Sequence, residues 1–136
     1  MSKPSLESGV YAALRVMAGA MFAFHGAQKI FGLFATKPPP EVMSQLWIGG
    51  LIELVGGAFI AIGLATRLLA VLCAGTMAVA YFQFHVGSDW GGWNWLPIVN
   101  RGDLAVLYCF VFLLIAARGP GPLAVDNHLA FARRWR

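Results

Sequence analysis

The side chains of this chain that could do acid–base or binding chemistry lie inside long apolar stretches. His25 and Lys29 belong to "FAFHGAQKIFG", Glu53 to "GGLIELVGG" and His85 to "YFQFHVG". Ionisable side chains in hydrocarbon cost a few kcal/mol on insertion scales, so they pair or line a polar cavity. Histidine exchanges protons near neutral pH and carboxylates relay them, so this set could bind and protonate a buried substrate.

A helical stripe links some of these residues to a deeper cation. At 3.6 residues per turn, Arg15, Phe22, His25 and Lys29 fall on one face. Arg15 precedes His25 by about 15 Å of helix. It could anchor that half of the helix by bonding carbonyls, or extend a polar path inward, and the sequence leaves both possibilities open.

The elements that must position these residues are transmembrane helices. Of the 136 residues, 59% are hydrophobic and only 12% charged, with a mean hydropathy of +0.69. A bilayer core needs roughly 20 helical residues per span. The apolar runs predict an all-α, integral membrane bundle of four transmembrane helices in a single domain, 1–136. The predicted spans are 9–34, 46–65, 67–86 and 101–118.

Helix-ending and helix-capping residues separate the runs. Pro38 to Pro40 predict a loop, because proline cannot continue a helix. Gly63 is expected to end the second helix in a left-handed conformation and Thr66 to cap the third. Asn100 is expected to cap the fourth helix, with Asp103 in its first turn.

The basic residues predict an orientation rather than a nucleic-acid partner. The net charge is +4, but the charges flank the spans. Seven basic residues would lie on one side, namely Lys3, Arg15, Arg67, Arg118, Arg133, Arg134 and Arg136, and three on the other, namely Lys29, Lys37 and Arg101. The positive-inside rule then places both termini on the cytoplasmic side of the membrane, which we expect to be a bacterial inner membrane.

In this orientation every span brings an ionisable residue to the outer half of the bilayer. These residues are His25, Lys29, Glu53, His85 and Asp103, and Tyr81 lies one turn below His85. Simpler explanations stay open for some of them. Lys29 could snorkel to the interface and Asp103 could serve only as a capping acid. Glu53 could form a purely structural pair with Lys29 or Arg15.

Other cofactor chemistries find little support. Cys73 and Cys109 form no C-x-x-C motif, and small buried hydrophobes explain them. His25, His85, Glu53 and Asp103 are acceptable metal ligands, but they come from separate helices and a nearby lysine would repel a cation, so no metal is expected. No haem, iron–sulfur or nucleotide-binding motif occurs.

The chain resembles the DoxX family of small four-helix membrane proteins. The resemblance rests on "RVMAGAMFAFHGAQKIFG", "GGLIELVGGAFIAIGLATRLLA", "MAVAYFQFH", "NRGDLAVLYCFVFLLIAARGPG" and "LAVD", in this order. It places the family's polar pattern on Arg15, His25, Lys29, Glu53 and His85. The family's common glutamate is here Asp103, whose reach is one methylene shorter, and Arg101 adds a charge where the family is often neutral.

The resemblance implies membrane redox chemistry, since some relatives are subunits of thiosulfate:quinone oxidoreductases. His25 and His85 would then contact the two oxygens of a quinone, and Glu53 would relay protons as the third catalytic residue. Lys29 would favour a quinol anion. Arg15, Lys29, Tyr81 and Asp103 would complete the quinone-binding set, and thiosulfate could be drawn to Lys29 and Arg101.

Two other functions remain open at this point. The chain could be a non-catalytic membrane subunit or assembly factor, whose polar cluster sets helix register and which binds a redox partner protein or a second copy of itself. A small transporter is less favoured, because the sequence shows neither inverted repeats nor a broken helix.

Overall fold

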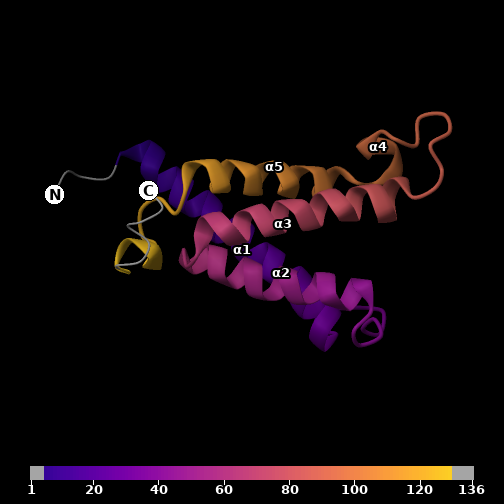
Figure 1. The fold of residues 1–136 in the computed structure, drawn as a ribbon, viewed down its shortest axis with the longest axis horizontal. Helices are drawn as coiled ribbons and strands as arrows, with labels where there is room; N and C mark the ends of the chain where they lie inside the picture. Colours follow the sequence, from indigo (N-terminus) through magenta and orange to yellow (C-terminus); the bar gives the residue numbers. More distant parts are fainter. Residues whose placement is uncertain (1–4, 130–136) are drawn as a thin grey trace.

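The computed structural model describes residues 5–129 and contains only helices over that range. Four long helices run along the long axis of the molecule: α1 (Leu6–Phe31), α2 (Gln45–Ile62), α3 (Thr66–Ala80) and α5 (Asp103–Arg118) (Figure 1). α3 continues into a π-helical turn, η1 (Tyr81–Val86), and two short elements follow, α4 (Pro97–Asn100) and η2 (Val125–Asn127). The predicted all-α fold is confirmed.

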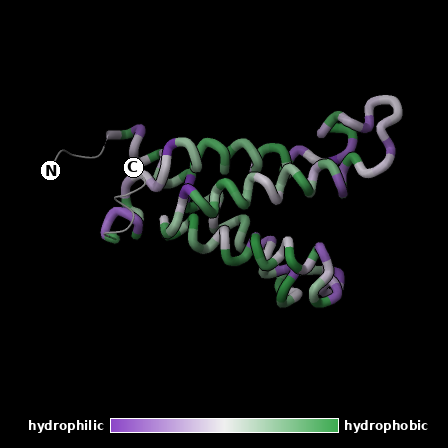
Figure 2. Tube along the Cα trace, in the orientation of Figure 1, coloured by the Kyte–Doolittle hydropathy of each residue, from purple (hydrophilic) through white to green (hydrophobic). Residues whose placement is uncertain are grey.

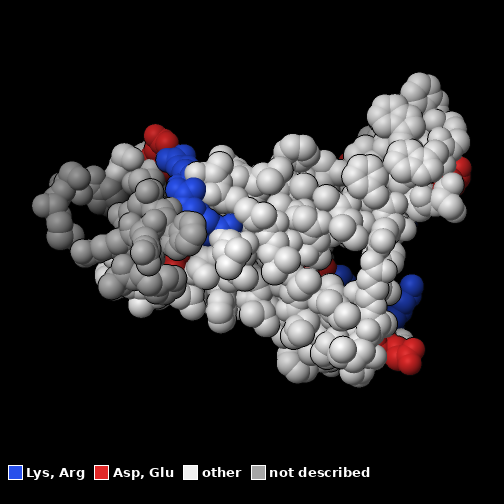
Figure 3. All heavy atoms as spheres, in the orientation of Figure 1, with Lys and Arg blue, Asp and Glu red and all other residues white. Residues whose placement is uncertain are grey.

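Three segments of the described chain are long and apolar enough to cross a membrane. They are Leu6–Phe31, Gln45–Ile62 and Thr66–Val86, the last joining α3 to η1. α5 has 16 residues and falls short of that length. Hydrophobic residues dominate the middle of the helices (Figure 2), and charged side chains gather near the two ends of the long axis (Figure 3). The protein is therefore a multi-pass membrane protein.

Local capping explains where the first two long helices begin and end. Ser5 and Ser44 accept hydrogen bonds from the backbone amides of Ser8 and Trp47, each at 3.2 Å. Such caps satisfy amides that have no partner inside the helix. α2 ends at Gly63 in the left-handed conformation that glycine adopts without strain, with φ 75°, which confirms that prediction.

The cap of α3 differs from the prediction. Thr66 was expected to cap this helix, but Ala65 occupies the cap position and has no side-chain cap. The carboxylate of Asp126 accepts instead from the amides of Ala65 and Thr66, at 2.8 and 2.9 Å. A residue 60 positions further along the chain therefore caps the start of α3. The sequence around Thr66 contains no pattern from which this distant partner could be predicted.

The start of α5 also differs from the prediction. The side chain of Asn100 accepts from the amide of Gly102 at 2.8 Å, which makes a local turn rather than a helix cap. Arg101 is left-handed, with φ 59°, so the helix cannot pass through it. α5 therefore begins at Asp103, after Gly102 in the cap position.

The long helices pack as two pairs. α1 and α2 meet backbone to backbone at glycines, because a Cβ added to Gly26 would lie 2.2 Å from the amide nitrogen of Leu54. A Cβ on Gly19 would lie 2.6 Å from the carbonyl oxygen of Gly57. Small residues let helices approach this closely in lipid. α3 and α5 form the second pair and lie side by side in Figure 1.

An aromatic core joins the two pairs at mid-length. The ring of Phe22 on α1 contacts Tyr108 and Phe112 on α5, with ring centroids 5.1 and 4.7 Å apart. Ile60 and Ile115 are fully buried beside them. Edge and tilted ring contacts of this kind add to the packing between helices.

A network of cation–carbonyl contacts holds the segment after α5 at one end of the bundle. Arg15 is 0% exposed and donates to the carbonyls of Pro120, Pro122 and Leu123, the last at 2.8 Å. Arg67 donates to two carbonyls at the end of α5, each at 2.7 Å. We call Arg15 with residues 119–126 the arginine clasp. It ties together the ends of both helix pairs, whereas α2 diverges from α3 toward the opposite end (Figure 1).

Candidate functional site

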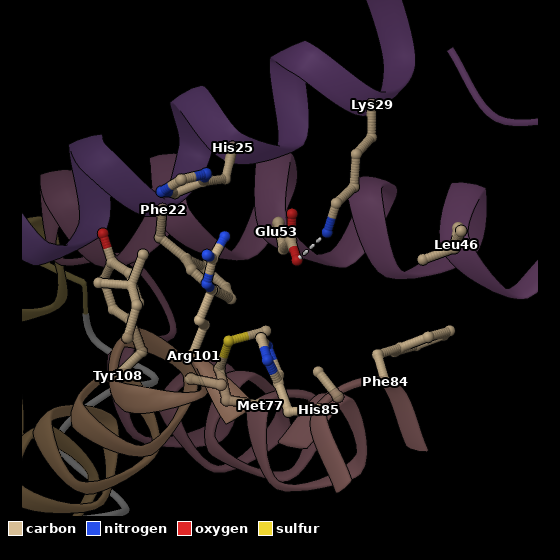
Figure 4. A pocket seen from close by; sticks show the side chains of 13 residues that line it. Phe22, His25, Lys29, Leu46, Glu53, Met77, Phe84, His85, Arg101 and Tyr108 are labelled. Atoms are coloured by element: carbon tan, nitrogen blue, oxygen red, sulfur yellow. Dashed lines mark hydrogen bonds and ion pairs between the residues drawn. The ribbon is translucent and has the colours of Figure 1, made fainter. Parts of the chain in front are cut away.

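A cavity of about 300 Å³ lies between the two helix pairs. Figure 4 shows its side chains approaching from all four long helices and from the α4–α5 connection. It is lined by Phe22, His25, Lys29, Leu46, Glu53, Met77, Ala80, Phe84, His85, Arg101, Leu104, Ala105 and Tyr108. The structure thus brings four of the predicted site residues together, namely His25, Lys29, Glu53 and His85.

Glu53 and Lys29 form an ion pair across the α1–α2 seam. Lys29 Nζ lies 2.5 Å from Glu53 Oε1, and the Glu53 residue is 2% exposed (Figure 4). Gly50 makes the pair possible, because a Cβ there would lie 2.6 Å from Lys29 Cβ and block the lysine stem. The sequence left open a structural pair of Glu53 with either Lys29 or Arg15, and the structure contains the pair with Lys29. This pair involves only one of the two carboxylate oxygens of Glu53.

Two buried oxygen atoms of the cavity lining have no hydrogen-bond partner in the described chain. They are Glu53 Oε2 and the hydroxyl of Tyr108, a residue that is 6% exposed. Leaving a buried polar group unsatisfied costs about 1–3 kcal/mol. Because both residues line one cavity, a polar ligand in it is a candidate partner for these oxygen atoms.

His85 is oriented by the π-helical turn and by the loop that follows it. Its Nδ1 lies 3.2 Å from the carbonyl oxygen of Asn100. A carbonyl only accepts, so Nδ1 carries the hydrogen and donates. The ring stacks on Tyr81, with centroids 6.3 Å apart. A π-turn of this kind often marks a functional position in a helix.

Three predicted binding residues lie outside the cavity lining. Arg15 belongs to the arginine clasp at the other end of the bundle. The hydroxyl of Tyr81 donates to the carbonyl of Trp95 and accepts from the side chain of Asn100, so it supports the loop behind His85. Asp103 is exposed in the first turn of α5.

Two lining residues with polar side chains, Tyr108 and Arg101, were missing from the predicted site. Tyr108 was missed because it sits in the apolar period of α5 with Ala105, Phe112 and Ile115, where it looks like a core residue. The signal that could have indicated it is the hydroxyl group of Tyr108 within an otherwise apolar stretch of the helix. Arg101 was considered only as an attraction for anions, yet its guanidinium points into the cavity (Figure 4).

The described residues contain no group of three histidine, cysteine or acidic side chains placed to hold a metal ion. The polar groups of the cavity are instead two imidazoles, one carboxylate, one phenol and two cations. This donor set, between apolar walls from Phe22, Met77 and Phe84, is suited to a small organic ligand that carries polar groups.

The fold and the cavity define a small multi-pass helical membrane protein with a polar pocket between two helix pairs. Residues 10–86 match the DoxX family, and the chain belongs to that family. The resemblance predicted from the sequence is thereby confirmed.

Two relatives among known proteins cover most of the chain. A Haemophilus influenzae protein described as "Uncharacterized protein" is 38% identical over 117 residues, covering 84% of this chain and 86% of that protein. A Bacillus subtilis (strain 168) protein named "Putative oxidoreductase CatD" is 29% identical over 119 residues, covering 83% of this chain and 81% of that protein. No solved structure matches the fold significantly.

Proposed function

We propose that the protein is a quinone-linked oxidoreductase of the membrane, or the membrane subunit of one. The carrying observation is the cavity between the helix pairs, where apolar walls surround His25, His85, Glu53 and the unpartnered hydroxyl of Tyr108. A volume of about 300 Å³ is at the lower end of ligand pockets and suits a single substituted ring. The name of the Bacillus subtilis relative, "Putative oxidoreductase CatD", supports the same class of activity.

The proposal includes a membrane arrangement. α5 serves as the fourth span beside α3, and residues 1–136 form a single four-helix domain in a bacterial inner membrane. Both termini are cytoplasmic. Arg15, Arg67 and Arg118 support this orientation, because all three lie at the same end of the bundle. Arg15 and Arg67 donate to carbonyls at or after the end of α5, and Arg118, the last residue of α5, pairs with Glu7 at the start of α1. Lys3, Arg133, Arg134 and Arg136, which the orientation also uses, lie outside the described residues.

The chain's own residues supply binding and proton transfer. When bound, a quinone accepts two electrons and two protons. His25 and His85 would hold the ring oxygens from opposite helix pairs, and Glu53 would exchange protons with a ring oxygen. Lys29 orients the carboxylate through their ion pair. The backbone amide of Arg101 donates to the carbonyl of Pro97, but its guanidinium makes no hydrogen bond or ion pair within residues 5–129 and is available to an anion.

The electrons come from a small sulfur oxyanion or from a partner subunit. With thiosulfate as the donor, two ions join through a new sulfur–sulfur bond to give tetrathionate and release two electrons. Arg101 and Lys29 attract such an anion to the cavity. A redox partner protein or a second copy of the chain could deliver the electrons instead.

A second candidate function is that of a non-catalytic membrane subunit or assembly factor. The observation in its favour is the Lys29–Glu53 pair, which links α1 to α2 without any ligand. In this case the exposed Trp90, Trp93 and Trp95, which are 58%, 69% and 48% exposed, would contact a partner protein.

The quinone content of the isolated protein distinguishes the two functions. We expect protein purified gently from native membranes to retain a quinone in its lipid extract, in amounts near one per chain. His25→Ala and His85→Ala should each lower that content at least about tenfold, because each removes a charged or polar contact to a ring oxygen. Extraction into solvent followed by liquid chromatography measures it.

His128→Ala is the matched control, since His128 is exposed and lies outside the cavity. It should retain the wild-type quinone content. A wild-type extract free of quinone, together with no redox response to thiosulfate or a quinol analogue, would contradict the proposed function and favour the assembly-factor alternative.

A further inference from the structure

The buried wall of the cavity presents a carboxylate that acts as a hydrogen-bond acceptor toward a ligand before any proton is transferred. Lys29 Nζ contacts Glu53 Oε1 at 2.5 Å, and a carboxylate in such an ion pair offers acceptors and no donor. Its second oxygen, Oε2, is buried and has no partner in the described chain. A ligand carbonyl at this position would bring two acceptors together, whereas a ligand hydroxyl would donate to Oε2.

The opposite wall carries a second potential acceptor. His85 uses Nδ1–H to donate to the carbonyl of Asn100 at 3.2 Å. In a neutral imidazole with the hydrogen on Nδ1, Nε2 is an acceptor. The backbone around Asn100 therefore selects the tautomer that accepts from a ligand, and Glu53 and His85 lie on different helix pairs of the same cavity.

The remaining polar groups tolerate either ligand form. The hydroxyl of Tyr108 both donates and accepts, and it has no partner among the described residues. Arg101 and Lys29 are donors, and they stabilise negative charge on a ligand oxygen. Glu53 and His85 are the two lining groups whose bonds within the described chain fix them as acceptors, so they discriminate between a ring carbonyl and a ring hydroxyl, and both favour the hydroxyl. A neutral His25 ring, also in the lining, offers one donor and one acceptor nitrogen and tolerates either form.

We propose that the cavity recognises the hydroxylated, reduced form of its ring ligand and binds it at least about tenfold more tightly than the oxidised form, as one hydrogen bond to a charged group allows. The proposal rests on the proposed function. It also has a redox consequence, because each tenfold preference for the reduced form raises the midpoint potential of a bound two-electron couple by about 30 mV. The protein would thus make the bound quinone a stronger oxidant.

Three ligands that differ only at the ring oxygens test this proposal. They are a short-chain benzoquinone, the corresponding benzoquinol, and the dimethyl ether of that benzoquinol. Affinities are measured by anaerobic calorimetric titration of the full chain in nanodiscs, corrected for partition into empty discs. We expect the benzoquinol to bind at least about tenfold more tightly than the other two, because only it can donate to Glu53.

Glu53→Gln provides the matching variant, because its amide adds a donor and removes the charge. The benzoquinol preference should shrink toward equal affinity, whereas Glu41→Gln, an exposed acid in the α1–α2 loop, should keep it. If Glu53→Gln fails to fold, the ratios of the three ligand affinities measured on the wild-type protein are sufficient to test the proposal. Equal affinities, or a dimethyl ether that binds like the benzoquinol, would overturn this inference and leave the proposed function intact. Failure of all three ligands to bind would overturn the proposed function itself.

Discussion

Replacing Glu53 by glutamine is expected to slow quinone reduction at least about 100-fold, the usual contribution of a positioned acid or base. The amide has nearly the same shape, but it cannot take up and release a proton. Its oxygen can still accept from Lys29, so the α1–α2 contact survives. The measurement is thiosulfate-driven reduction of a soluble benzoquinone by the purified protein in liposomes, followed by ultraviolet absorbance.

The control for this experiment is Glu41→Gln, which changes an exposed carboxylate far from the cavity lining and should leave the rate unchanged. Thermal unfolding in detergent is measured for both variants. A Glu53→Gln protein that unfolds readily while its folded fraction turns over at the wild-type rate would identify Glu53 as a structural strut. Absence of turnover in the wild type would contradict thiosulfate as the donor.

Replacing Arg15 by glutamine is expected to cause a large loss of stability, about 3 kcal/mol or more, because several buried carbonyls lose their donor at once. Arg15 donates to the carbonyls of Pro120, Pro122 and Leu123 from a fully buried position. Chemical unfolding in mixed micelles measures the change. Arg118→Gln is the control, because Arg118 and its partner Glu7 are both exposed, and such pairs contribute less than about 1 kcal/mol.

The same variant decides between the two roles that the sequence left open for Arg15. As part of the clasp, Arg15→Gln should lower stability and leave quinone affinity of the remaining folded protein unchanged. A variant that keeps its stability but loses quinone binding would show that Arg15 extends the polar path of the cavity, against the role assigned here.

Much of the site was predictable because membrane sequences carry a strong constraint on where charges lie. His25 and Lys29 share a helical stripe with Phe22, and Glu53 is flanked by glycines that require a close helix neighbour. Both patterns are local, and the structure places these side chains in one cavity. The left-handed end of α2 at Gly63 was predictable for the same reason.

The features that the sequence did not predict depend on contacts between distant segments. Asp126 caps α3 from across the chain, and Arg15 binds the segment after α5, so neither partner is visible in a sequence window. Arg101 adopts a left-handed conformation that only the turn around Asn100 explains. Tyr108 follows the apolar period of its helix, and its role emerges only where α5 faces α1.

The most direct test of the central claim is photolabelling of the full chain in membranes with an azido-benzoquinone, followed by peptide mass spectrometry. The cavity between the helix pairs predicts adducts in both pairs, near residues 22–29 of α1 and 77–85 of α3 and η1, and excess unlabelled quinone should suppress them. Adducts confined to the lipid-facing side of one helix pair, or unaffected by the competitor, would contradict a quinone site at this position.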